Sequence, residues 1–229
     1  MNWGIIDMKI QISDNLIKHY LQNVYFINGH SYAGKSTMVK MLAERFDMVP
    51  CGENYHDVFP REMLSRWKQP GLCYFDTMSG WEEWLSMTPE EHYNWTYNVS
   101  QECIEIEILE LLKLAASGKK IIVDTNIPPD VLREISDYNH VAIMLCDPPD
   151  ICATKFFDRE DHDKKFMMDQ IKLCKDPEKT LKNFNSWALY HPPLETDWEH
   201  TGFFTYTRSD FENDTREEMM EALVKHFRL

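Results

Sequence analysis

Eight consecutive residues near the start of the chain have the types and spacing of a loop that binds phosphate groups. They fit the pattern Gly-x-x-x-x-Gly-Lys-Ser and are Gly29, His30, Ser31, Tyr32, Ala33, Gly34, Lys35 and Ser36. Glycines at both ends let the backbone curve closely around a ligand, so that its amide groups converge on one point. Lys35 supplies a point charge for phosphate oxygens, and the Ser36 hydroxyl is suited to Mg²⁺. We therefore expect residues 29–36, with Thr37 beside them, to hold a polyphosphate.

The segments on either side of this loop support that interpretation. A short apolar run at residues 24–28 predicts a buried strand, and apolar residues at helical spacing over 36–46 predict an amphipathic helix. A phosphate-binding loop needs a strand before it and a helix after it, because the first amides of the helix point at the phosphates. The alternative is a glycine turn that matches the pattern by chance, and the flanking elements weigh against it.

A second acidic position suits the same chemistry. Residues 121–124 form an apolar run that ends in Asp124. If this predicted strand lies beside the first one, the Asp124 carboxylate stands next to the phosphate loop and can help Ser36 to hold Mg²⁺. The alternative is a plain turn-forming aspartate, because many strands end in this residue.

Short β-rich runs alternate with helical patterns along the whole chain. Strands are predicted near residues 24–28, 48–51, 121–124, 141–146 and 203–207. Such alternation is typical of a parallel sheet covered by helices on both faces, and it indicates a single domain over 1–229. The pattern dissolves from residue 52 to about 86, which predicts an irregular, partly helical segment rich in aromatic residues, and we place an insertion over 52–95.

Two segments carry the start signal of a helix. Thr88, Pro89 and Glu91 form a capping box with proline at the first helical position, and the helical pattern that follows runs to Gly118. This length leaves open a break near residues 97–101. Thr215 and Glu218 have the spacing of a second capping box, before the last helix.

The composition restricts the class of protein. The chain of 229 residues carries 24 Lys and Arg against 38 Asp and Glu, a formal net charge of −14. This balance argues against nucleic-acid partners, whose phosphates are neutralised by basic residues. No apolar run approaches the roughly 20 residues that a membrane span needs, and no signal peptide is visible. The six cysteines lack Cys-x-x-Cys spacing, which favours reduced thiols in a cytoplasmic protein.

At this point the residues resemble a family, the small P-loop kinases related to nucleoside, nucleoside-monophosphate and shikimate kinases and to chloramphenicol phosphotransferase. Residues 29–36 are the specific match, and the order of elements is similar from Tyr25 to the C-terminus. The resemblance implies an α/β fold, the P-loop NTPase three-layer α/β/α sandwich. Its five-stranded parallel sheet would have the order 2-3-1-4-5, which puts Asp124 beside the loop. It also implies ATP and Mg²⁺ as cofactors and a small-molecule acceptor as partner.

The family has an arginine-bearing lid after the fourth strand, and residues 156–175 occupy that place here. A mobile cation can stabilise the charge that spreads over a phosphoryl group in transfer, and Arg159 is our candidate for it. The alternative is a solvated charged face with ion pairs along a helix. The sequence departs from the family in having a single arginine among four acids over 158–163.

The insertion over 52–95 corresponds to the segment that binds the acceptor in such kinases. Asp57 is the candidate that takes the proton from an attacking hydroxyl, with Glu53 second and His56 a further option. Arg61 and Arg66 could clamp an anionic group. The alternatives are an ordinary polar loop for these residues, and for the aromatic residues the core of a small helical subdomain. Near the end of the fifth strand, the resemblance implies a contact with adenine. Arg208, Ser209 and Asp210 fall in that segment, and Arg208 is our candidate.

These features favour an ATP- and Mg²⁺-dependent phosphotransferase whose acceptor bears a hydroxyl or a phosphate. A second hypothesis, kept open by the arginine-poor lid, is a nucleotide-binding regulator that does not transfer phosphate. A GTPase or mechanical ATPase fits less well, because Asp124 is followed by Thr125, Asn126 and Ile127 rather than by Asp-x-x-Gly, and Asn-Lys-x-Asp is absent.

Overall fold

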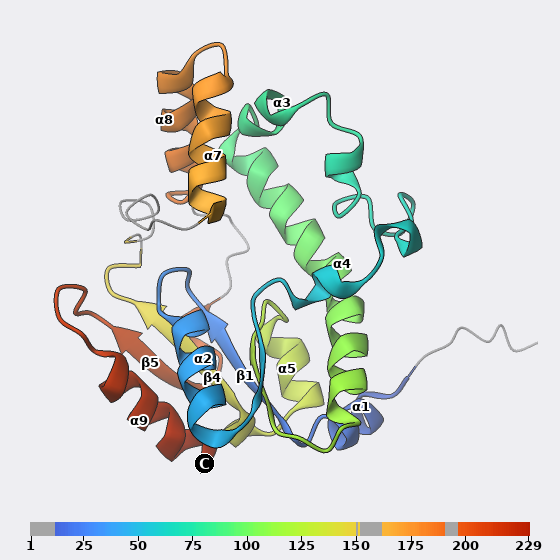
Figure 1. The fold of residues 1–229 in the computed structure, drawn as a ribbon, viewed down its shortest axis with the longest axis vertical. Coiled ribbons are helices and arrows are strands. Elements are labelled where there is room, and N and C mark those ends of the chain that lie inside the picture. Colours follow the sequence, from blue (N-terminus) through green and yellow to red (C-terminus); the bar gives the residue numbers. More distant parts are fainter. Residues whose placement is uncertain (1–11, 150, 152–161, 191–196) are drawn as a thin grey trace, which may run out of the picture.

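The computed structural model describes residues 12–149, 151, 162–190 and 197–229, and it has a five-stranded sheet at its centre (Figure 1). All neighbouring strands are parallel, and their order is β2-β3-β1-β4-β5, which confirms the predicted topology. The strands are β1 (Val24–Gly29), β2 (Val49–Cys51), β3 (Ile121–Asp124), β4 (Val141–Cys146) and β5 (Phe204–Arg208). Each lies within one or two residues of the segment predicted for it.

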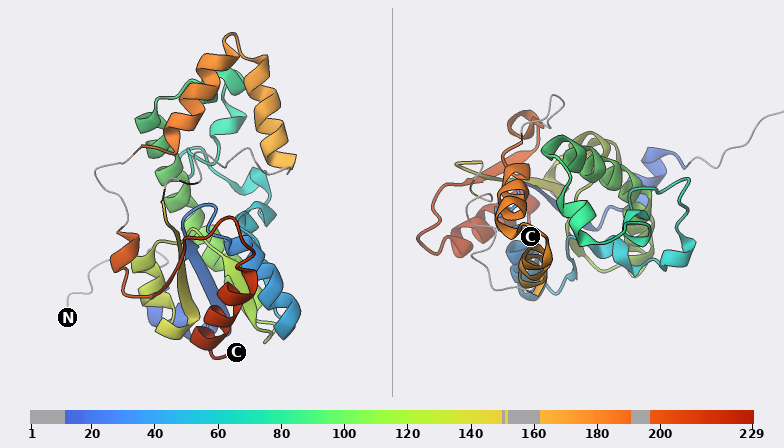
Figure 2. Two further views of the ribbon diagram at one scale, coloured as in Figure 1. Left: turned by 90° about the vertical axis from the view of Figure 1, so that its left-hand side faces the viewer. Right: turned by 90° about the horizontal axis from the view of Figure 1, so that it is seen from above.

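Helices cover both faces of the sheet, because successive side chains of a strand point to opposite sides. On β1, Tyr25 and Ile27 pack with α2 (Lys35–Phe46) and α9 (Arg216–Phe227). Val24 and Phe26 pack on the other side, against α1 (Asp14–Tyr20), α5 (Pro129–Ile135) and the second half of α4 (Pro89–Ala115). Figure 2 shows the resulting helix–sheet–helix layers from the side. Strands buried on both faces explain the continuous apolar runs of the sequence.

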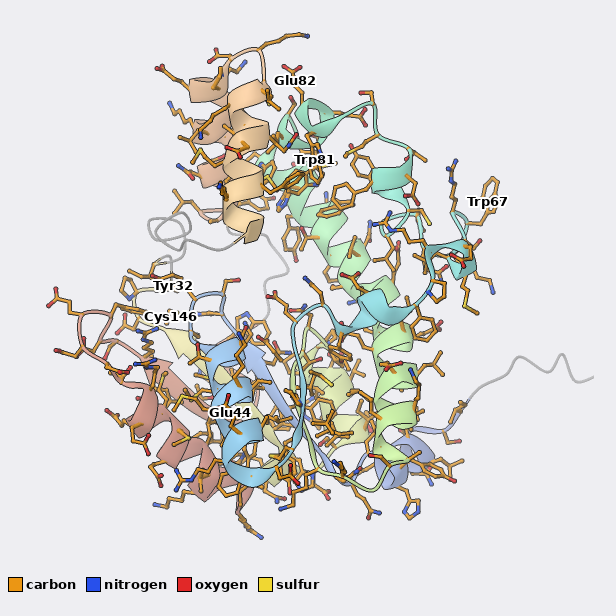
Figure 3. The ribbon with its side chains drawn as sticks, in the orientation of Figure 1. Tyr32, Glu44, Trp67, Trp81, Glu82 and Cys146 are labelled. Carbon is orange, nitrogen blue, oxygen red and sulfur yellow. The ribbon has the colours of Figure 1, made fainter. Side chains whose placement is uncertain are left out.

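A helical subdomain stands above the carboxyl ends of the strands (Figure 1). It consists of α3 (Trp81–Leu85), the first half of α4, α7 (His162–Leu173) and α8 (Pro177–Trp187). Its core contains Trp84, Leu85, Ile171 and Cys174 and is surrounded by further aromatic and methionine side chains. In Figure 3 the labelled Trp81 points toward α7, and its ring lies 5.2 Å from that of Phe166. Most aromatic residues of the insertion therefore form a core with the two helices that follow the fourth strand.

Helix α4 connects this subdomain to the sheet. It runs unbroken through 27 residues, about 40 Å, so the break considered near 97–101 does not occur. The predicted capping box is present: Thr88 Oγ1 accepts from the Glu91 amide, and the Glu91 carboxylate accepts from the Thr88 amide. A single helix thus contributes side chains both to the core beneath the sheet and to the core of the helical subdomain.

The second predicted capping box is wrong. Thr215 precedes α9, but its hydroxyl makes no cap hydrogen bond and is buried without a hydrogen-bond partner among the described residues. Its backbone, with φ −98° and ψ 7°, is not in the extended conformation that directs a capping side chain toward the helix amides, whereas Thr88 has φ −64° and ψ 161°.

Short 3₁₀ helices complete the described structure. Three lie in the insertion, at Tyr55–Val58, Arg61–Met63 and Tyr74–Asp76, and two others at Tyr138–His140 and Trp198–His200. No helix among the described residues is long and apolar enough to cross a membrane.

Candidate functional site

The loop of residues 29–36 leaves the end of β1 and enters α2, as the pattern predicts. Gly29 has φ +120°, and a Cβ there would lie 2.8 Å from Met144 N and closer still to Met144 O on the neighbouring strand β4. Gly34 has φ +98°, again a conformation that favours glycine. Tyr32 has φ +72°, which is unusual for a bulky residue and marks local strain. Only a residue without a side chain fits at Gly29.

The first amides of α2 lack hydrogen-bond partners among the described residues. Within the described part of the chain, the amides of Gly34, Lys35 and Ser36 donate to no protein group, and Gly34 provides no capping side chain. Amide groups at the first turn of a helix carry partial positive charge and bind anions. The loop and α2 therefore form a site that suits a phosphate group.

Lys35 lies inside this loop rather than in solvent. Only 7% of its surface is exposed, and Nζ donates to the carbonyl oxygens of Gly29 (3.2 Å) and His30 (3.1 Å). Nζ also lies 3.8 Å from Asp124 Oδ1. The ammonium group is thus held over the loop by two neutral acceptors and one carboxylate, and a phosphate oxygen can replace the weaker of these contacts.

Asp124 and Ser36 meet at the end of the sheet, as predicted from the strand order. The Ser36 hydroxyl donates to Asp124 Oδ2 at 2.7 Å, and the register of β1 and β3 sets Asp124 opposite Ile27. Asp124 is 1% exposed, and its Oδ1 makes no hydrogen bond to any described residue. Burial raises the pKa of Asp124, while Lys35 and the bond from Ser36 oppose that shift.

These donors fit a magnesium ion. Mg²⁺ is commonly held by one or two carboxylates together with water and substrate phosphates. Asp124 offers a buried oxygen without a hydrogen bond, and Ser36 offers a hydroxyl on the side of the helix amides. Among the described residues, no group of three or more His, Cys, Asp or Glu could hold a metal alone. The ion would therefore need oxygens from a ligand.

Asn28 is a contributor that the sequence analysis missed. Its side chain accepts from the Gly29 amide at 2.6 Å and donates to the Ile127 carbonyl at 2.7 Å. It thereby ties the start of the loop to the segment that follows Asp124. The signal was a fully polar residue at the end of an apolar strand, and such a residue is buried only when it is hydrogen-bonded.

A buried polar cluster lies beside Asp124, and it too was missed. The Tyr55 hydroxyl donates to Glu107 Oε2 at 2.9 Å and lies 3.3 Å from Thr125 Oγ1, which itself donates to Glu107 at 3.2 Å. Glu107 is 1% exposed. Burial and the nearby Glu107 charge raise the pKa of Tyr55, so the phenol stays protonated and donates. In the sequence, Glu107 cannot be told from the exposed Glu105 of the same helix, so no local pattern predicts that Glu107 is buried.

This cluster positions the predicted acceptor segment. Tyr55 begins the 3₁₀ helix that contains Asp57, and Thr125 directly follows Asp124. Asp57 is exposed and lines a cavity between this segment and α4. Glu53 is also exposed, and its charge acts on the Asp124 carboxyl. The side chain of His56 lies outside the described part of the structure.

Of the two arginines proposed to clamp an anion, Arg61 pairs with Asp76 at 2.6 Å. Arg66 is exposed on the neighbouring turn. Trp67, which follows it, is 96% exposed and projects away from the molecule in Figure 3. The structure thus gives Arg61 a carboxylate partner and places Arg66 on the outer surface.

Arg208 lies at the end of β5, where its guanidinium stands 4.7 Å from the centre of the Phe211 ring and its Nε donates to the Asp210 carbonyl. The Phe211 ring is 6.0 Å from that of Tyr32 in the loop. On the same edge, the Cys146 amide donates to His30 Nδ1 at 3.2 Å, and Figure 3 shows Tyr32 and Cys146 close together. Arg208 is therefore linked to the loop through two aromatic rings.

The predicted lid is described in part. Arg159 lies outside the described residues, as does the rest of 156–161. The remainder of the segment contains α7, whose Ile171 belongs to the core of the helical subdomain and whose Met167 packs against that core. Lys165 on this helix is exposed.

Comparisons with known proteins do not assign the chain to a family. No protein-family model matches the chain, and no curated protein matches it significantly in sequence.

Proposed function

We propose that this protein is an ATP- and Mg²⁺-dependent phosphotransferase, a kinase of the P-loop NTPase fold acting on a small acceptor. The observation that carries the proposal is the meeting of Lys35, Ser36 and Asp124 at the start of α2. A lysine over a loop of converging amides, with a hydroxyl and a carboxylate beside it, is the set of groups that phosphoryl transfer from a nucleotide requires. The parallel sheet supports it, because ligands bind at the carboxyl ends of its strands.

Each residue has a distinct task in this proposal. Lys35 and the amides of the 29–36 loop hold the phosphates and offset the negative charge that develops on them. Ser36 and Asp124 hold Mg²⁺ directly or through water, and the ion supplies further charge neutralisation on the phosphate oxygens when it is bound. Asp57 accepts the proton of the attacking hydroxyl, and Arg159 and Arg208 remain our candidates for the lid cation and the adenine contact.

The test compares two lysines of the same helix. Lys35→Ala should lower the rate of acceptor-stimulated ADP release by about 100-fold or more, because the substitution removes the positive charge that Lys35 supplies to the phosphates. Lys40→Ala is the matched control, since Lys40 is exposed in the second turn of the same helix. The assay would use a panel of nucleosides, nucleotides, hydroxyl-bearing antibiotics and small metabolites, with circular dichroism as the check on folding.

Two outcomes would contradict the proposal. Full activity of a folded Lys35→Ala variant would remove the loop from the mechanism. Tight ATP binding without transfer to any acceptor would favour the nucleotide-binding regulator instead.

A further inference from the structure

Glu107 is a charged residue buried in an apolar part of the molecule. It is 1% exposed, and Leu111 and Ala115, which follow it in α4, belong to the core beneath the sheet. A buried carboxylate costs free energy, and a well-packed apolar side chain in its place often leaves a fold equally stable or more stable. The stability of the core therefore does not explain why α4 places a carboxylate beside the end of β3.

Two hydroxyl groups from different segments donate to the same oxygen of Glu107. The Tyr55 hydroxyl lies 2.9 Å from Oε2, and the Thr125 hydroxyl lies 3.2 Å from it. A hydroxyl has one proton to donate and can also accept. Since Thr125 gives its proton to Glu107, its oxygen is left to accept, and it accepts from the Ile127 amide at 3.1 Å. Glu107 therefore fixes the direction of the Thr125 hydroxyl and, through it, the turn of residues 125–127.

This turn is tied to the start of the phosphate loop. The Ile127 carbonyl accepts from the Asn28 side chain at 2.7 Å, and the same side chain accepts from the Gly29 amide at 2.6 Å. Asn28, Thr125 and Ile127 are each 2% exposed or less. An unbroken series of hydrogen bonds therefore connects Glu107 on α4 with Gly29, the first residue of the loop.

The Thr125 hydroxyl is also next to the carboxylate proposed to hold magnesium. Thr125 directly follows Asp124, whose Oδ1 is buried and makes no hydrogen bond to any described residue. Burial is the main cause of the raised pKa of Asp124, and the charge of Glu107 adds to it, so the two carboxylates lie near each other. Groups that hold a metal ligand in place tune the site, and their loss commonly weakens metal binding by about 10- to 100-fold. Glu107 and Thr125 stand in this position behind Asp124.

From these contacts we infer that Glu107 is a positioning residue for the nucleotide site. Through the Thr125 hydroxyl it fixes the turn that follows Asp124, and so keeps the Asp124 carboxylate where it can hold the magnesium ion of bound ATP. The Tyr55 hydroxyl brings the 3₁₀ helix Tyr55–Val58 to the same oxygen, so the candidate acceptor segment shares this support. The inference rests on the proposed function and adds a residue that acts through Thr125 rather than by touching the nucleotide.

The experiment measures ATP binding to the full chain by titration calorimetry, once with Mg²⁺ and once with EDTA. The first variant is Glu107→Met, which keeps an unbranched side chain suited to a helix but removes the acceptor. With Mg²⁺ we expect ATP to bind about tenfold more weakly than to the unmodified chain. With EDTA we expect binding to be unchanged or tighter, because a negative charge near the site is lost. Glu105→Met is the matched control at an exposed position of the same helix, and it should change neither value by more than about twofold.

A second pair of variants separates the hydrogen bond from the charge. Thr125→Val keeps the shape of the side chain and every charge, but it removes the hydroxyl that connects Glu107 to the turn. Thr125→Ser retains that hydroxyl. We expect Thr125→Val to weaken ATP binding by about tenfold with Mg²⁺ and to leave it unchanged with EDTA. Thr125→Ser should bind ATP within about threefold of the unmodified chain under both conditions.

Urea denaturation shows which variants are folded under the conditions of the titration. Should Thr125→Val fail to fold, Glu107→Gln takes its place. The amide removes the charge but keeps an oxygen that can accept from both hydroxyls. If the hydrogen bonds carry the effect, Glu107→Gln should bind ATP with Mg²⁺ nearly as tightly as the unmodified chain does, and a loss as large as that of Glu107→Met overturns the inference.

The outcomes separate this inference from the proposed function. If the unmodified chain binds no ATP with Mg²⁺, the proposed function fails and the inference fails with it. If the unmodified chain binds ATP, and Glu107→Met and Thr125→Val leave that binding unchanged, only the inference is overturned.

Three further results would also overturn the inference alone. A loss confined to Glu107→Met would show that its charge acts directly, and a loss confined to Thr125→Val would assign the role to Thr125 without Glu107. An equal loss with Mg²⁺ and with EDTA would mean that the cluster supports the fold as a whole rather than the position of Asp124.

Discussion

The Ser36 hydroxyl donates a 2.7 Å hydrogen bond to Asp124, which lies 88 residues further along the chain. Parallel pairing of β1 with β3 brings them together, because it sets the end of each strand at the same edge of the sheet. Asp124 keeps one oxygen without a hydrogen bond to the described residues, although the carboxyl group is buried. A buried polar atom of this kind is costly unless a ligand or ion completes it.

Asp124→Asn should make nucleotide binding less dependent on magnesium. The amide keeps the shape of the side chain but removes the charge, so ATP binding in the presence of Mg²⁺ should weaken by about tenfold or more. Without Mg²⁺, with EDTA present, binding should be unchanged or tighter, because a negative charge near the phosphates is lost. Titration calorimetry under both conditions measures this, with Asp130→Asn, an exposed aspartate of α5, as control. Equal weakening with and without the metal would argue against a role in holding it.

Gly29→Ala should destabilise the fold strongly. A Cβ at Gly29 would meet the backbone of Met144, which cannot move without breaking the pairing of β1 with β4, and the residue has φ +120°. We expect a loss of more than about 3 kcal/mol in the free energy of unfolding. Gly118→Ala is the control, because Gly118 has φ +73° with open space around it, so its loss should stay near 1 kcal/mol, about the cost of the left-handed conformation alone. Urea denaturation followed by circular dichroism measures the free energy of unfolding of both variants. Similar losses would show that the backbone at Met144 shifts to accommodate the added methyl group.

Asp57→Asn should lower kcat by about 100-fold with an active acceptor if Asp57 takes the hydroxyl proton. The dissociation constant of ATP should stay unchanged, because Asp57 lines the cavity rather than the 29–36 loop. Glu53→Gln is the matched comparison, since Glu53 is an exposed acid of the same segment. Steady-state kinetics separates the two. A larger fall in kcat for Glu53→Gln would transfer the role to Glu53.

His92 should make the helical subdomain sensitive to acid. Its ring stacks on that of Trp187 at 3.8 Å, and burial lowers the pKa of His92 from 6.5 to about 4. Between these values the unfolded chain binds a proton that the folded chain does not, so the free energy of unfolding falls as the pH drops from 6.5 toward 4. The loss approaches about 3 kcal/mol below pH 4.

The variant His92→Phe keeps a stacking ring without a titrating group. Urea unfolding of both proteins at pH 7 and pH 5 should show a smaller loss of stability for the variant, by about 2 kcal/mol. The comparison cancels the effect of the other groups that titrate in this range. An identical loss in both proteins would mean that His92 is protonated without cost in the folded state.

Local patterns in the sequence were sufficient for the strands and for the loop at Gly29 and Lys35. An apolar run of four to six residues rich in Ile and Val is typical of a strand in a covered sheet, and the glycine–lysine spacing indicates the loop from residues close together in the chain. The position of Asp124 followed from the strand order, which the resemblance supplied. The capping box at Thr215 failed, because the backbone angles that make a cap are set by how the chain enters α9.

The sequence by itself determined which segments form the sheet and which residues form the loop at its edge, because both depend on neighbours within a few positions. Tertiary structure alone decided that Tyr55 meets Glu107 and Thr125, which lie 52 and 70 residues away, and that α7 and α8 share a core with the insertion. It also decided the cavity against Ile106. The physical reason is that burial and hydrogen bonding between distant segments depend on how a rigid helix such as α4 is placed, and side-chain spacing along the chain does not encode that placement.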